Sequence, residues 1–440
     1  MFRKSVFRIS GWALAASLLC CGLVAAPANA ATPGTAVVHE LLAQPNQLRN
    51  RLSQVSPEVG AARSRIAQAE ADASTTRLIP NPVVDASLAG IPVSNAGGAR
   101  FRDSTVWNVG VSETIELGKR GPRQAAADLR SRAARSYYSG ALAERVGDAR
   151  LSMANALHLL RRTATLEESL QDAERATALE KVRYEQKALA GMDYDRLLLE
   201  LENLSAEVAH SRAEYEAALA DCSAVLLGPC DLSSAREEDL DSALPLNSAL
   251  TAAPDWLARP DVQGNLLERD AAQREAVLAR RRAIPDLTLR VGYVRDNTAG
   301  GPQAVDGLSV GVMMPLPVSD RGQHDAAKAL SRAEELDQLR TATLTSAHAE
   351  LTGLLRRKEA LERTLAILEK DSLPRAKSVL ESTQQAFDHG GISLTDFLLA
   401  RRSYVSLRLL LLEQRYELFT VRNDIYRVLG LDARSYENAR

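Results

Sequence analysis

The chain repeats itself after roughly 200 residues, and this duplication restricts its fold more than any other feature. Matching residues lie 201 positions apart early in the repeat and 203 positions apart further along. The matches are Val109-Gly110-Val111 with Val310-Gly311-Val312, Arg120-Gly121 with Arg321-Gly322, Ala125-Ala126 with Ala326-Ala327, Tyr184 with Phe387, and Asp193-Tyr194 with Asp396-Phe397. Each copy is predicted to contain a helix, two strands joined by a loop, a very long helix, a tight turn and a return helix.

The chain therefore divides into two repeats joined by a linker. The first repeat covers 31–228, and the second covers 258–440. The elements expected in the first are a β-hairpin at 83–117, a long helix at 120–188, a tip turn at 188–193 and a return helix at 194–227. Those expected in the second are a β-hairpin at 286–317, a long helix at 320–389, a tip turn at 390–393 and a return helix at 394–430. Residues 229–257 are expected to form the linker, at the equator of the molecule.

Residues 1–30 have the pattern of a secretory signal peptide. Three basic residues precede an apolar run at 9–26, and Ala28-Asn29-Ala30 supplies a cleavage site. The mature chain would then start near Ala31 and lie in an exported compartment. The alternatives are a retained membrane anchor and lipid attachment at Cys20 or Cys21.

Four short segments alternate strictly between apolar and polar or small residues. The apolar positions are Val84, Ala86 and Leu88; Trp107, Val109, Val111, Ile115 and Leu117; Leu287, Leu289, Val291 and Tyr293; and Leu308, Val310, Val312, Met314 and Leu316. A period of two predicts strands with one apolar face, and the longer runs suit a tilted strand that crosses a bilayer. Trp107 and Tyr293 are expected to contribute to an aromatic girdle at the membrane surface. Half-buried hairpins of a soluble protein are the alternative.

The helices are too long for a compact domain, since about seventy residues span on the order of 100 Å. The return helices carry heptads that predict packed seams. Their seam positions are Tyr194, Leu197, Leu201, Leu204, Val208, Ser211, Tyr215, Ala218, Cys222 and Val225, and Phe397, Ala400, Tyr404, Leu407, Leu411, Gln414, Leu418, Val421, Ile425 and Val428. An aromatic content of 4% fits such helices better than several independent cores. A mean hydropathy of −0.18 excludes a polytopic helical membrane protein, and a net charge of −2 argues against nucleic-acid binding.

Four strands cannot close a barrel, and an open sheet edge is not viable in hydrocarbon. Several chains must therefore share one barrel, and three chains would supply twelve strands. The fold class predicted is mainly α with β: chains that contribute four strands each share one transmembrane β-barrel, which would be 12-stranded in a trimer, as the family resemblance given below implies for the outer membrane. A long periplasmic α-helical barrel continues it. Polar positions inside such a barrel would line a water-filled lumen.

The order and spacing of several short motifs resemble the TolC-type outer-membrane efflux factors, and most closely their CzcC-like heavy-metal branch. The motifs are Asn81-Pro82, Ile115-Glu116-Leu117-Gly118-Lys119-Arg120-Gly121, Arg259-Pro260-Asp261, Ile284-Pro285-Asp286, Pro315-Leu316-Pro317, and Gly391 followed by Asp396-Phe397. The resemblance covers essentially the whole mature chain. It implies a homotrimer in the outer membrane lipid, a periplasmic adaptor protein that docks at the tip, and an inner-membrane pump of the RND type. Two departures, Val318-Ser319-Asp320-Arg321-Gly322 and Ala188 in place of a turn glycine, leave the substrate open.

The two tip turns are the candidate adaptor-docking site, and ordinary helix capping without a partner is the alternative. The docking residues expected are Ala188, Ala190, Gly191, Asp193, Gly390, Gly391, Ile392 and Asp396. Glu185 and Asp388 precede the turns at equivalent positions and could form an acidic gate ring that attracts cations, although solvated helix ends would look the same.

Cys222 and Cys230 remain after signal cleavage, and Gly228-Pro229 can fold the chain back so that they form a disulfide. Two free thiols are the alternative. No catalytic motif, metal-ligand spacing or cofactor site is evident, so no enzyme is expected. The expected function is an efflux channel, with heavy-metal cations as the first choice of cargo. Organic compounds or a secreted protein are alternative cargoes, and a periplasmic coiled-coil scaffold is a different class of function.

Overall fold

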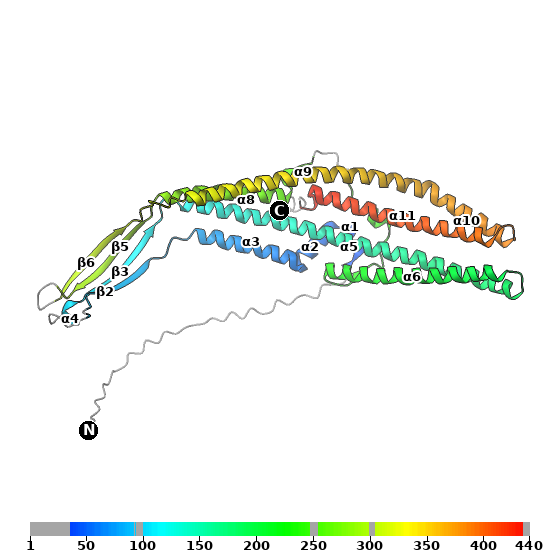
Figure 1. Cartoon of the computed structure of the whole chain (residues 1–440), viewed down its shortest axis with the longest axis horizontal. Coiled ribbons are helices and arrows are strands. Elements are labelled where there is room, and N and C mark those ends of the chain that lie inside the picture. Colours follow the sequence, from blue (N-terminus) through cyan, green and yellow to red (C-terminus); the bar gives the residue numbers. More distant parts are fainter. Residues whose placement is uncertain (1–35, 92, 94–99, 247–253, 299–303, 434–440) are drawn as a thin grey trace, which may run out of the picture.

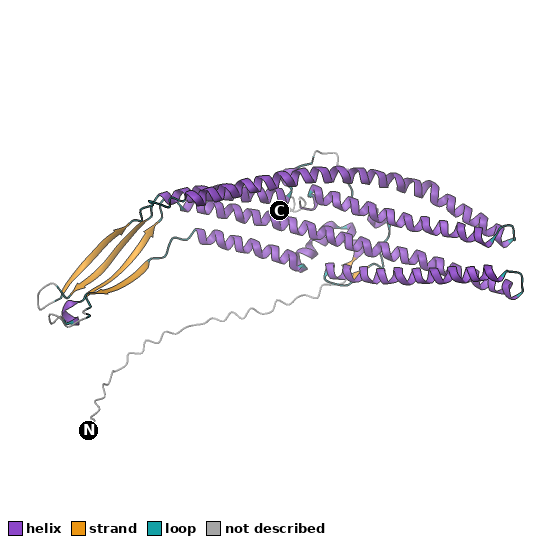
Figure 2. Ribbon diagram, in the orientation of Figure 1, coloured by secondary structure: helices purple, strands orange, loops and turns teal. Residues whose placement is uncertain are grey.

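The protein is described here from a computed structural model that covers residues 36–91, 93, 100–246, 254–298 and 304–433. The predicted signal peptide, with Cys20 and Cys21, lies outside these residues. The described chain is elongated, with a small β-sheet at one end, two helical turns at the other, and long helices between them (Figure 1). Figure 2 shows that helices make up most of this length.

The elements follow the predicted order in both repeats. In the first repeat they are β1 (Ala36–Val37), α1 (Val38–Ala43), α2 (Pro45–Val55), α3 (Pro57–Thr76), β2 (Val83–Ala89), α4 (Phe101–Ser104), β3 (Val106–Ile115), α5 (Arg120–Glu185) and α6 (Gly191–Leu226). Then come β4 (Cys230–Asp231), α7 (Glu238–Ser242), α8 (Pro260–Arg280), β5 (Leu287–Asp296), β6 (Val305–Met313), α9 (Gln323–Ile367), α10 (Leu373–Asp388) and α11 (Leu394–Leu429). Short 3₁₀ turns at Trp256–Ala258 and Arg281–Ala283 flank α8.

The four long strands form one antiparallel sheet in the order β2-β3-β5-β6. Adjacent strands keep one continuous register, so that Val84, Val111, Val291 and Val310 are successive cross-strand partners. The two hairpins therefore meet through β3 and β5. The strands β2 and β6 are the two edges of this sheet, and each carries backbone groups on its outer side that no described strand pairs with.

Sequence signals account for where several helices begin. Ser56 caps α3 by accepting a hydrogen bond from the Val59 amide, and Ser393 caps α11 by accepting one from the Asp396 amide. Pro57 and Pro260 occupy first-turn positions, where a missing amide proton costs nothing. The second return helix, predicted at 394–430, begins at Leu394 as expected.

The second long helix differs from the prediction of one element from 320 to 389. It begins at Gln323, and a π-helical segment at Leu368–Ser372 interrupts it before α10. Pro374 explains the interruption, because proline has no amide proton and its ring collides with the carbonyl four residues earlier. The first tip turn also differs, since α5 ends at Glu185 and α6 already begins at Gly191.

The largest buried cluster lies at mid-length, where α1, α2, α3, α5, α6, α7 and α11 meet. Its most enclosed members are Val38, Leu48, Leu52, Val59, Leu142, Met153, Leu157, Leu226 and Phe419. A second cluster joins α9 to α11 through Leu361, Leu365, Val421 and Ile425. Among the helices of the described chain, none contains a stretch apolar enough and long enough to cross a membrane.

Candidate functional site: a two-faced sheet and a helical tip

One face of the sheet exposes a continuous apolar surface. Its side chains are between 42% and 74% exposed, and they are Val84, Trp107, Val109, Val111, Ile115, Leu289, Val291, Tyr293, Leu308, Val310 and Val312. A contiguous apolar patch of this kind marks a surface that another apolar phase covers. The period-two pattern of the sequence therefore places its apolar residues outward instead of into a protein core.

Charged groups on this apolar face sit toward its two ends. Glu113, between Val111 and Ile115, is exposed near the helical end. At the far end the Tyr293 hydroxyl donates a hydrogen bond to Asp306 Oδ1 at 2.5 Å, and Asp306 is the cross-strand partner of Arg295. Trp107 is the partner of Arg295 on the other side. The two residues predicted for the girdle, Trp107 and Tyr293, thus share one face and the end that carries polar partners.

The opposite face of the sheet is mostly polar or small, and its larger apolar residues are Val83, Val106, Val294, Val305 and Met313. It carries Asp85, Ser87, Asn108, Gly110, Ser112, Thr114, Thr288, Arg290, Gly292, Ser309 and Gly311. Thr114 and Thr288 share a hydrogen bond of 2.9 Å between their hydroxyls. At the centre of this face, the guanidinium of Arg290 binds Asp85. A sheet with one apolar and one hydrogen-bonding face separates two media of different polarity.

At the other end of the molecule, the two helical turns have the same length and shape. They cover 186–190 and 389–393, and Lys187 and Gly390 have left-handed backbone angles with φ of 59° and 70°. Ala190 and Ser393 are the residues immediately before α6 and α11. The left-handed residue is Gly390 in the second turn and Lys187 in the first, and Ala188 corresponds to Gly391, the next residue along.

Stacked aromatic pairs hold each turn closed. Tyr184 stacks on Tyr194 with ring centroids 4.8 Å apart, and Phe387 stacks on Phe397 at 5.2 Å. The two hairpins also join each other, because Leu197, Leu394 and Phe397 form a small buried cluster. Together these contacts make the tip one rigid unit instead of two independent turns.

Most residues predicted for docking or gating lie at the surface of this tip. Those exposed are Glu185, Ala188, Ala190, Gly191, Asp388, Gly390, Gly391 and Asp396. Asp193 pairs with Arg196 at 3.3 Å, and the Ser393 hydroxyl donates a 2.7 Å hydrogen bond to Asp396, so both carboxylates serve the helix starts. Ile392 is half-buried against the tip cluster. Sequence reasoning missed Met192, which is 65% exposed beside Gly191.

The comparisons with known proteins agree with this geometry. Residues 257–431 match the family model described as outer membrane efflux protein. The chain is 24% identical over 378 residues to the cobalt-zinc-cadmium resistance protein CzcC of Cupriavidus metallidurans, covering 84% of this chain and 86% of CzcC. The second repeat of the chain therefore matches the outer membrane efflux family, and most of the chain is similar to CzcC.

Solved structures show the same fold at low sequence identity. The outer membrane protein VceC of Vibrio cholerae aligns with a TM-score of 0.70 and 18% identity, over 88% of this chain and 95% of VceC. CusC aligns with a TM-score of 0.72 and 16% identity, over 88% of this chain and 92% of CusC. The fold of this chain is therefore that of the TolC-type outer-membrane channels.

Two sequence motifs of the chain meet where the sheet gives way to helices. Asp286 accepts hydrogen bonds from the Leu117 amide at 3.1 Å and from Lys119 Nζ at 2.7 Å. Glu116 binds the guanidinium of Arg123 through both oxygens, at 2.5 and 2.9 Å. The motifs at 115–121 and 284–286 thus fasten the two hairpins to each other at the root of the sheet.

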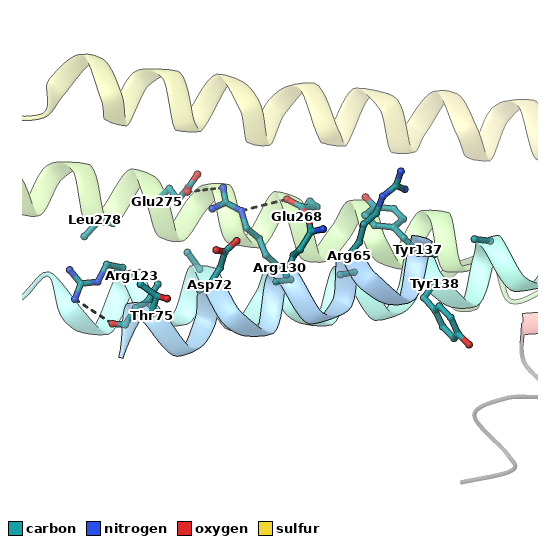
Figure 3. Close-up of a pocket in the computed structure, with 18 residues that line it drawn as sticks. Arg65, Asp72, Thr75, Arg123, Arg130, Tyr137, Tyr138, Glu268, Glu275 and Leu278 are labelled. Atoms are coloured by element: carbon teal, nitrogen blue, oxygen red, sulfur yellow. Dashed lines mark hydrogen bonds and ion pairs between the residues drawn. The ribbon is translucent and has the colours of Figure 1, made fainter. Parts of the chain in front are cut away.

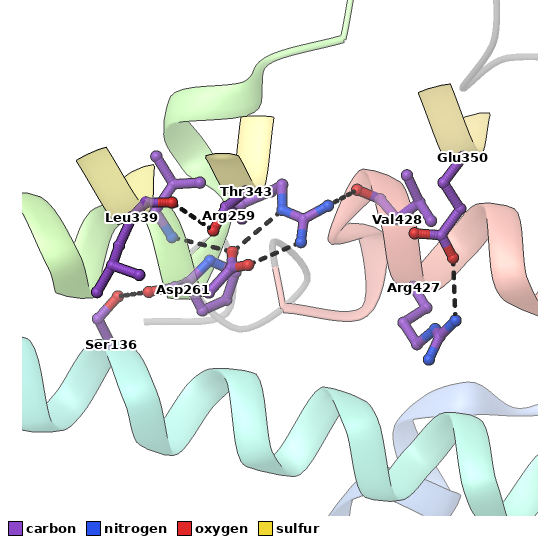
Figure 4. Close-up of polar contacts among 10 residues, drawn as sticks. Ser136, Arg259, Asp261, Leu339, Thr343, Glu350, Arg427 and Val428 are labelled. Carbon is purple, nitrogen blue, oxygen red and sulfur yellow. Dashed lines mark hydrogen bonds and ion pairs between the residues drawn. The ribbon is translucent and has the colours of Figure 1, made fainter. Parts of the chain in front are cut away.

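The Arg259-Pro260-Asp261 motif joins the ends of two helices (Figure 4). Arg259 binds Asp261 at 2.7 and 3.0 Å and donates to the Val428 carbonyl at 2.5 Å, where α11 ends. The Ser136 hydroxyl of α5 donates to the Pro260 carbonyl at 2.9 Å. Burial opposes the ionisation of Asp261, but the hydrogen bonds from Arg259 outweigh it and lower the pKa. This motif is structural, since it satisfies open helix ends.

A groove of about 600 Å³ lies between α3, α5 and α8 in the half of the molecule next to the sheet. Figure 3 shows Arg130 of α5 between two carboxylates of α8, Glu275 at 2.7 Å and Glu268 at 3.9 Å. Burial raises the pKa of Glu268. Six alanines line the groove, and Arg130 lies between the two carboxylates of α8, so these charges are largely balanced.

A disulfide joins Cys222 to Cys230, as the sequence favoured. It closes the turn after α6, and Cys230 begins the strand β4, which pairs in parallel with β1. Both cysteines are buried. The crosslink therefore fixes the linker and the start of the described chain to the end of the first return helix.

His158 is a buried histidine that the sequence did not single out. Its Nε2 lies 3.3 Å from Glu413 of α11, and its ring stacks on Tyr416 at 5.0 Å. Burial lowers its pKa, and Glu413 opposes this effect. Within the described residues, no cluster of three or more His, Cys, Asp or Glu side chains could hold a metal ion.

Proposed function

We propose that this chain forms, as a homotrimer, the outer-membrane channel of a tripartite efflux system that exports divalent heavy-metal cations. The main support for a channel is the two-faced sheet, because its apolar face suits contact with lipid and its polar face suits contact with water. The edges β2 and β6 would pair with the next chains, so that three chains close a 12-stranded barrel. The proposal involves no catalytic step and no cofactor.

The long helices would continue this barrel through the periplasm as a water-filled tunnel. A periplasmic adaptor would dock at the two tip turns and connect the tunnel to an inner-membrane pump of the RND type. The exposed apolar side chains of Met192, Leu199 and Leu399 near the tip suit contacts with other chains. Fold and family support this arrangement.

The choice of cargo rests on the similarity to CzcC, a cobalt-zinc-cadmium resistance protein, which extends along most of both chains. A conduit does not need to hold its cargo tightly, so a channel for metal ions does not require a ligand cluster. The test is a deletion of the gene, followed by growth with zinc, cobalt, cadmium, nickel or organic drugs. Greater sensitivity to the metals, restored by the wild-type gene, is the expected result. Sensitivity to drugs alone would assign the channel an organic cargo.

The state of the purified protein separates a channel from a periplasmic scaffold. A channel gives trimers that need detergent for extraction and that dissociate on heating in SDS. An elongated monomer released by salt would contradict the channel. A scaffold would also leave the conductance of planar bilayers unchanged.

Adaptor docking can be tested by crosslinking from single cysteines at the tip. Ala190→Cys and Gly391→Cys place thiols at exposed turn positions, whereas Ile392 is half-buried and less suitable. Arg332→Cys, on the half of α9 near the sheet, is the matched control because this position is also exposed. Adaptor products from both tip positions, and none from the control, are expected in cells with a working pump. Equal yields from the control would contradict docking at the tip.

The gate ring remains a proposal that depends on Glu185 and Asp388. The double variant Glu185→Gln/Asp388→Asn removes two exposed carboxylates from each chain. Lower selectivity for cations over anions in planar bilayers is the expected result, because the ring would concentrate cations at the tip. Unchanged selectivity would show that both residues are solvated helix ends.

A further inference from the structure

The polar face of the sheet contains one side chain that reaches all four strands. Arg290 projects from β5 across β3 and binds Asp85 of β2, with Nε 3.0 Å from Oδ1 and Nη2 2.5 Å from Oδ2. The strands β2 and β5 are not neighbours, since β3 lies between them. Nη2 also donates to Asn108 Oδ1 of β3 at 2.8 Å, and Nη1 donates to Ser309 Oγ of β6 at 3.4 Å.

Gly110 makes this reach possible. A Cβ atom at Gly110 would lie 2.8 Å from Arg290 Nη2 and 2.9 Å from Cζ, so a side chain here would push the flexible end of Arg290 out of its present position. Gly110 does not have a positive φ, so glycine is needed here for space and not for backbone conformation. It occupies the position on β3 opposite Asp85, directly under the guanidinium.

Arg290 is also the only cationic side chain on the polar face of the four described strands. The anionic residues on this face are Asp85 and, at the end of β5, Asp296. Arg295, on the same strand as Arg290, belongs to the apolar face. Asp85 is therefore the counter-ion that balances the one positive charge in the middle of this wall.

We propose that Asp85 preserves the cation selectivity of the barrel by neutralising Arg290 in its wall, and that the Asp85–Arg290 pair clamps the four strands together. This inference rests on the proposed function, because the trimer directs the polar face, with three copies of the pair, into the lumen. Without Asp85, three unpaired guanidinium groups would repel cations and concentrate anions along the path. Asp85 is thus a selectivity-determining residue, and Gly110 positions the guanidinium against the wall.

The charge role is tested by reversal potentials of purified trimers in planar bilayers under a KCl gradient. Asp85→Asn should lower the cation-to-anion permeability ratio by about threefold or more, and Arg290→Gln should raise it. The double variant Asp85→Asn/Arg290→Gln should return near the wild-type value. Arg295→Gln, which removes a cation from the opposite face of the same strand, is the matched control and should have little effect. Wild-type selectivity in both single variants, with intact trimers, would overturn the charge role.

The clamp is tested separately with Gly110→Ala, which keeps both charges but fills the space under the guanidinium. The trimer should dissociate in SDS at a lower temperature, while the selectivity stays close to wild type. Adding Gly110→Ala to Arg290→Gln should cost nothing more, because the pair is already lost. A Gly110→Ala trimer as heat-resistant as the wild type would overturn the clamp.

Two further outcomes separate this inference from the proposed function. If the wild-type protein forms trimers that do not conduct, the channel proposal fails, and the heat-dissociation series still decides whether the pair clamps the sheet. If Asp85→Asn alone forms no trimers, the double variant with Arg290→Gln should restore them. Failure of that restoration would overturn the pairing.

Discussion

The two long outgoing helices, α5 and α9, occupy equivalent positions in the two repeats, yet they bury different kinds of residue. The buried positions of α5 include many polar side chains: Ser131, Ser136, Arg150, His158, Thr163, Thr165, Ser169, Thr177 and Glu180. The buried positions of α9 are all apolar, and they are Ala326, Ala333, Leu336, Ala347, Leu351, Leu361 and Leu365. A duplicated sequence has therefore given one helix that is stabilised partly by polar contacts and one that packs through an apolar seam.

The positions of the two helices in the fold explain this difference. Helix α5 packs against α3, α6, α8 and α11, whereas α9 packs against α8 and α11. A helix enclosed by four neighbours along its length has to bury more of its circumference. Its buried polar groups then need partners from other helices. The first long helix is thus the central support of the protomer.

The largest effect is expected from breaking a buried ion pair of α5. Arg150 is 3% exposed, and its Nη1 lies 2.7 Å from Asp432 beyond the end of α11. Arg150→Met should lower the free energy of unfolding by about 3–5 kcal/mol, because it leaves Asp432 without its buried partner. Urea unfolding followed by helical circular dichroism measures this change.

The exposed ion pair between Arg332 and Glu335 on α9 is the matched control. Arg332→Met should change the free energy of unfolding by less than about 1 kcal/mol, because solvent screens an exposed pair. Equal losses from Arg150→Met and Arg332→Met would contradict the difference between the two helices.

The second largest effect is expected from removing the disulfide, which the second repeat lacks. The residues 203 positions after Cys222 and Cys230 are Ile425 and Ala433, so the second repeat closes the same turn without a crosslink. Replacing both cysteines by alanine should cost about 2–3 kcal/mol through the entropy of a short closed loop. A thermal scan with and without reductant measures it. A wild-type protein with the same midpoint in reductant would show that packing alone closes the turn.

A smaller effect is expected where one repeat uses glycine and the other does not. Lys187 and Gly390, 203 residues apart, both have left-handed backbone angles, and a Cβ at Gly390 would meet nothing within 4 Å. Gly390→Ala should destabilise the second turn by about 1 kcal/mol, and Lys187→Gly should stabilise the first by up to about 1 kcal/mol. Hydrogen exchange of the turn amides measures both. Shifts of the same sign in the two turns would contradict the assignment of strain to Lys187.

The smallest expected effect is a dependence of stability on pH that arises from His158 of α5. Burial lowers the pKa of His158 in the folded protein, and Glu413, Arg162 and Glu214 are the charged groups that act on it. The unfolded chain therefore binds a proton that the folded chain does not, and stability falls as the pH drops below about 6.5. Thermal midpoints of His158→Gln should depend less on pH in this range. His210→Gln, at an exposed histidine of α6, is the control and should keep the wild-type dependence.

Much of the fold could be predicted because it depends on local periodicity. Alternating residues gave the four strands, and Leu197, Val208, Ser211, Ala218 and Cys222 are buried seam positions of α6 that the heptads indicated. The interruption of the second long helix could not be placed in the same way. Pro374 marked a local disturbance, but the π-helical segment lies before it, at Leu368–Ser372.

The positions of the tip turns and of the two-faced strands could be predicted, but the side-chain contacts within them could not. Gly390 was identified as a turn residue, whereas the left-handed conformation of Lys187 depends on the stacked rings and caps around it. Asp85 and Arg290 are 205 residues apart, and neither belongs to a recognisable motif. Only the register of four strands brings them together across Gly110.

The sequence by itself determined the duplication, the two-faced strands, the long heptad helices and the cysteine pair, because each depends on the spacing of residues along the chain. The tertiary structure alone decided which repeat supplies the central helix and which polar groups it buries. It also decided how Arg290 reaches Asp85 over a glycine. These features depend on how many other helices or strands pack against an element and on side chains that come from distant parts of the chain. The periodicity of one segment carries no information about either.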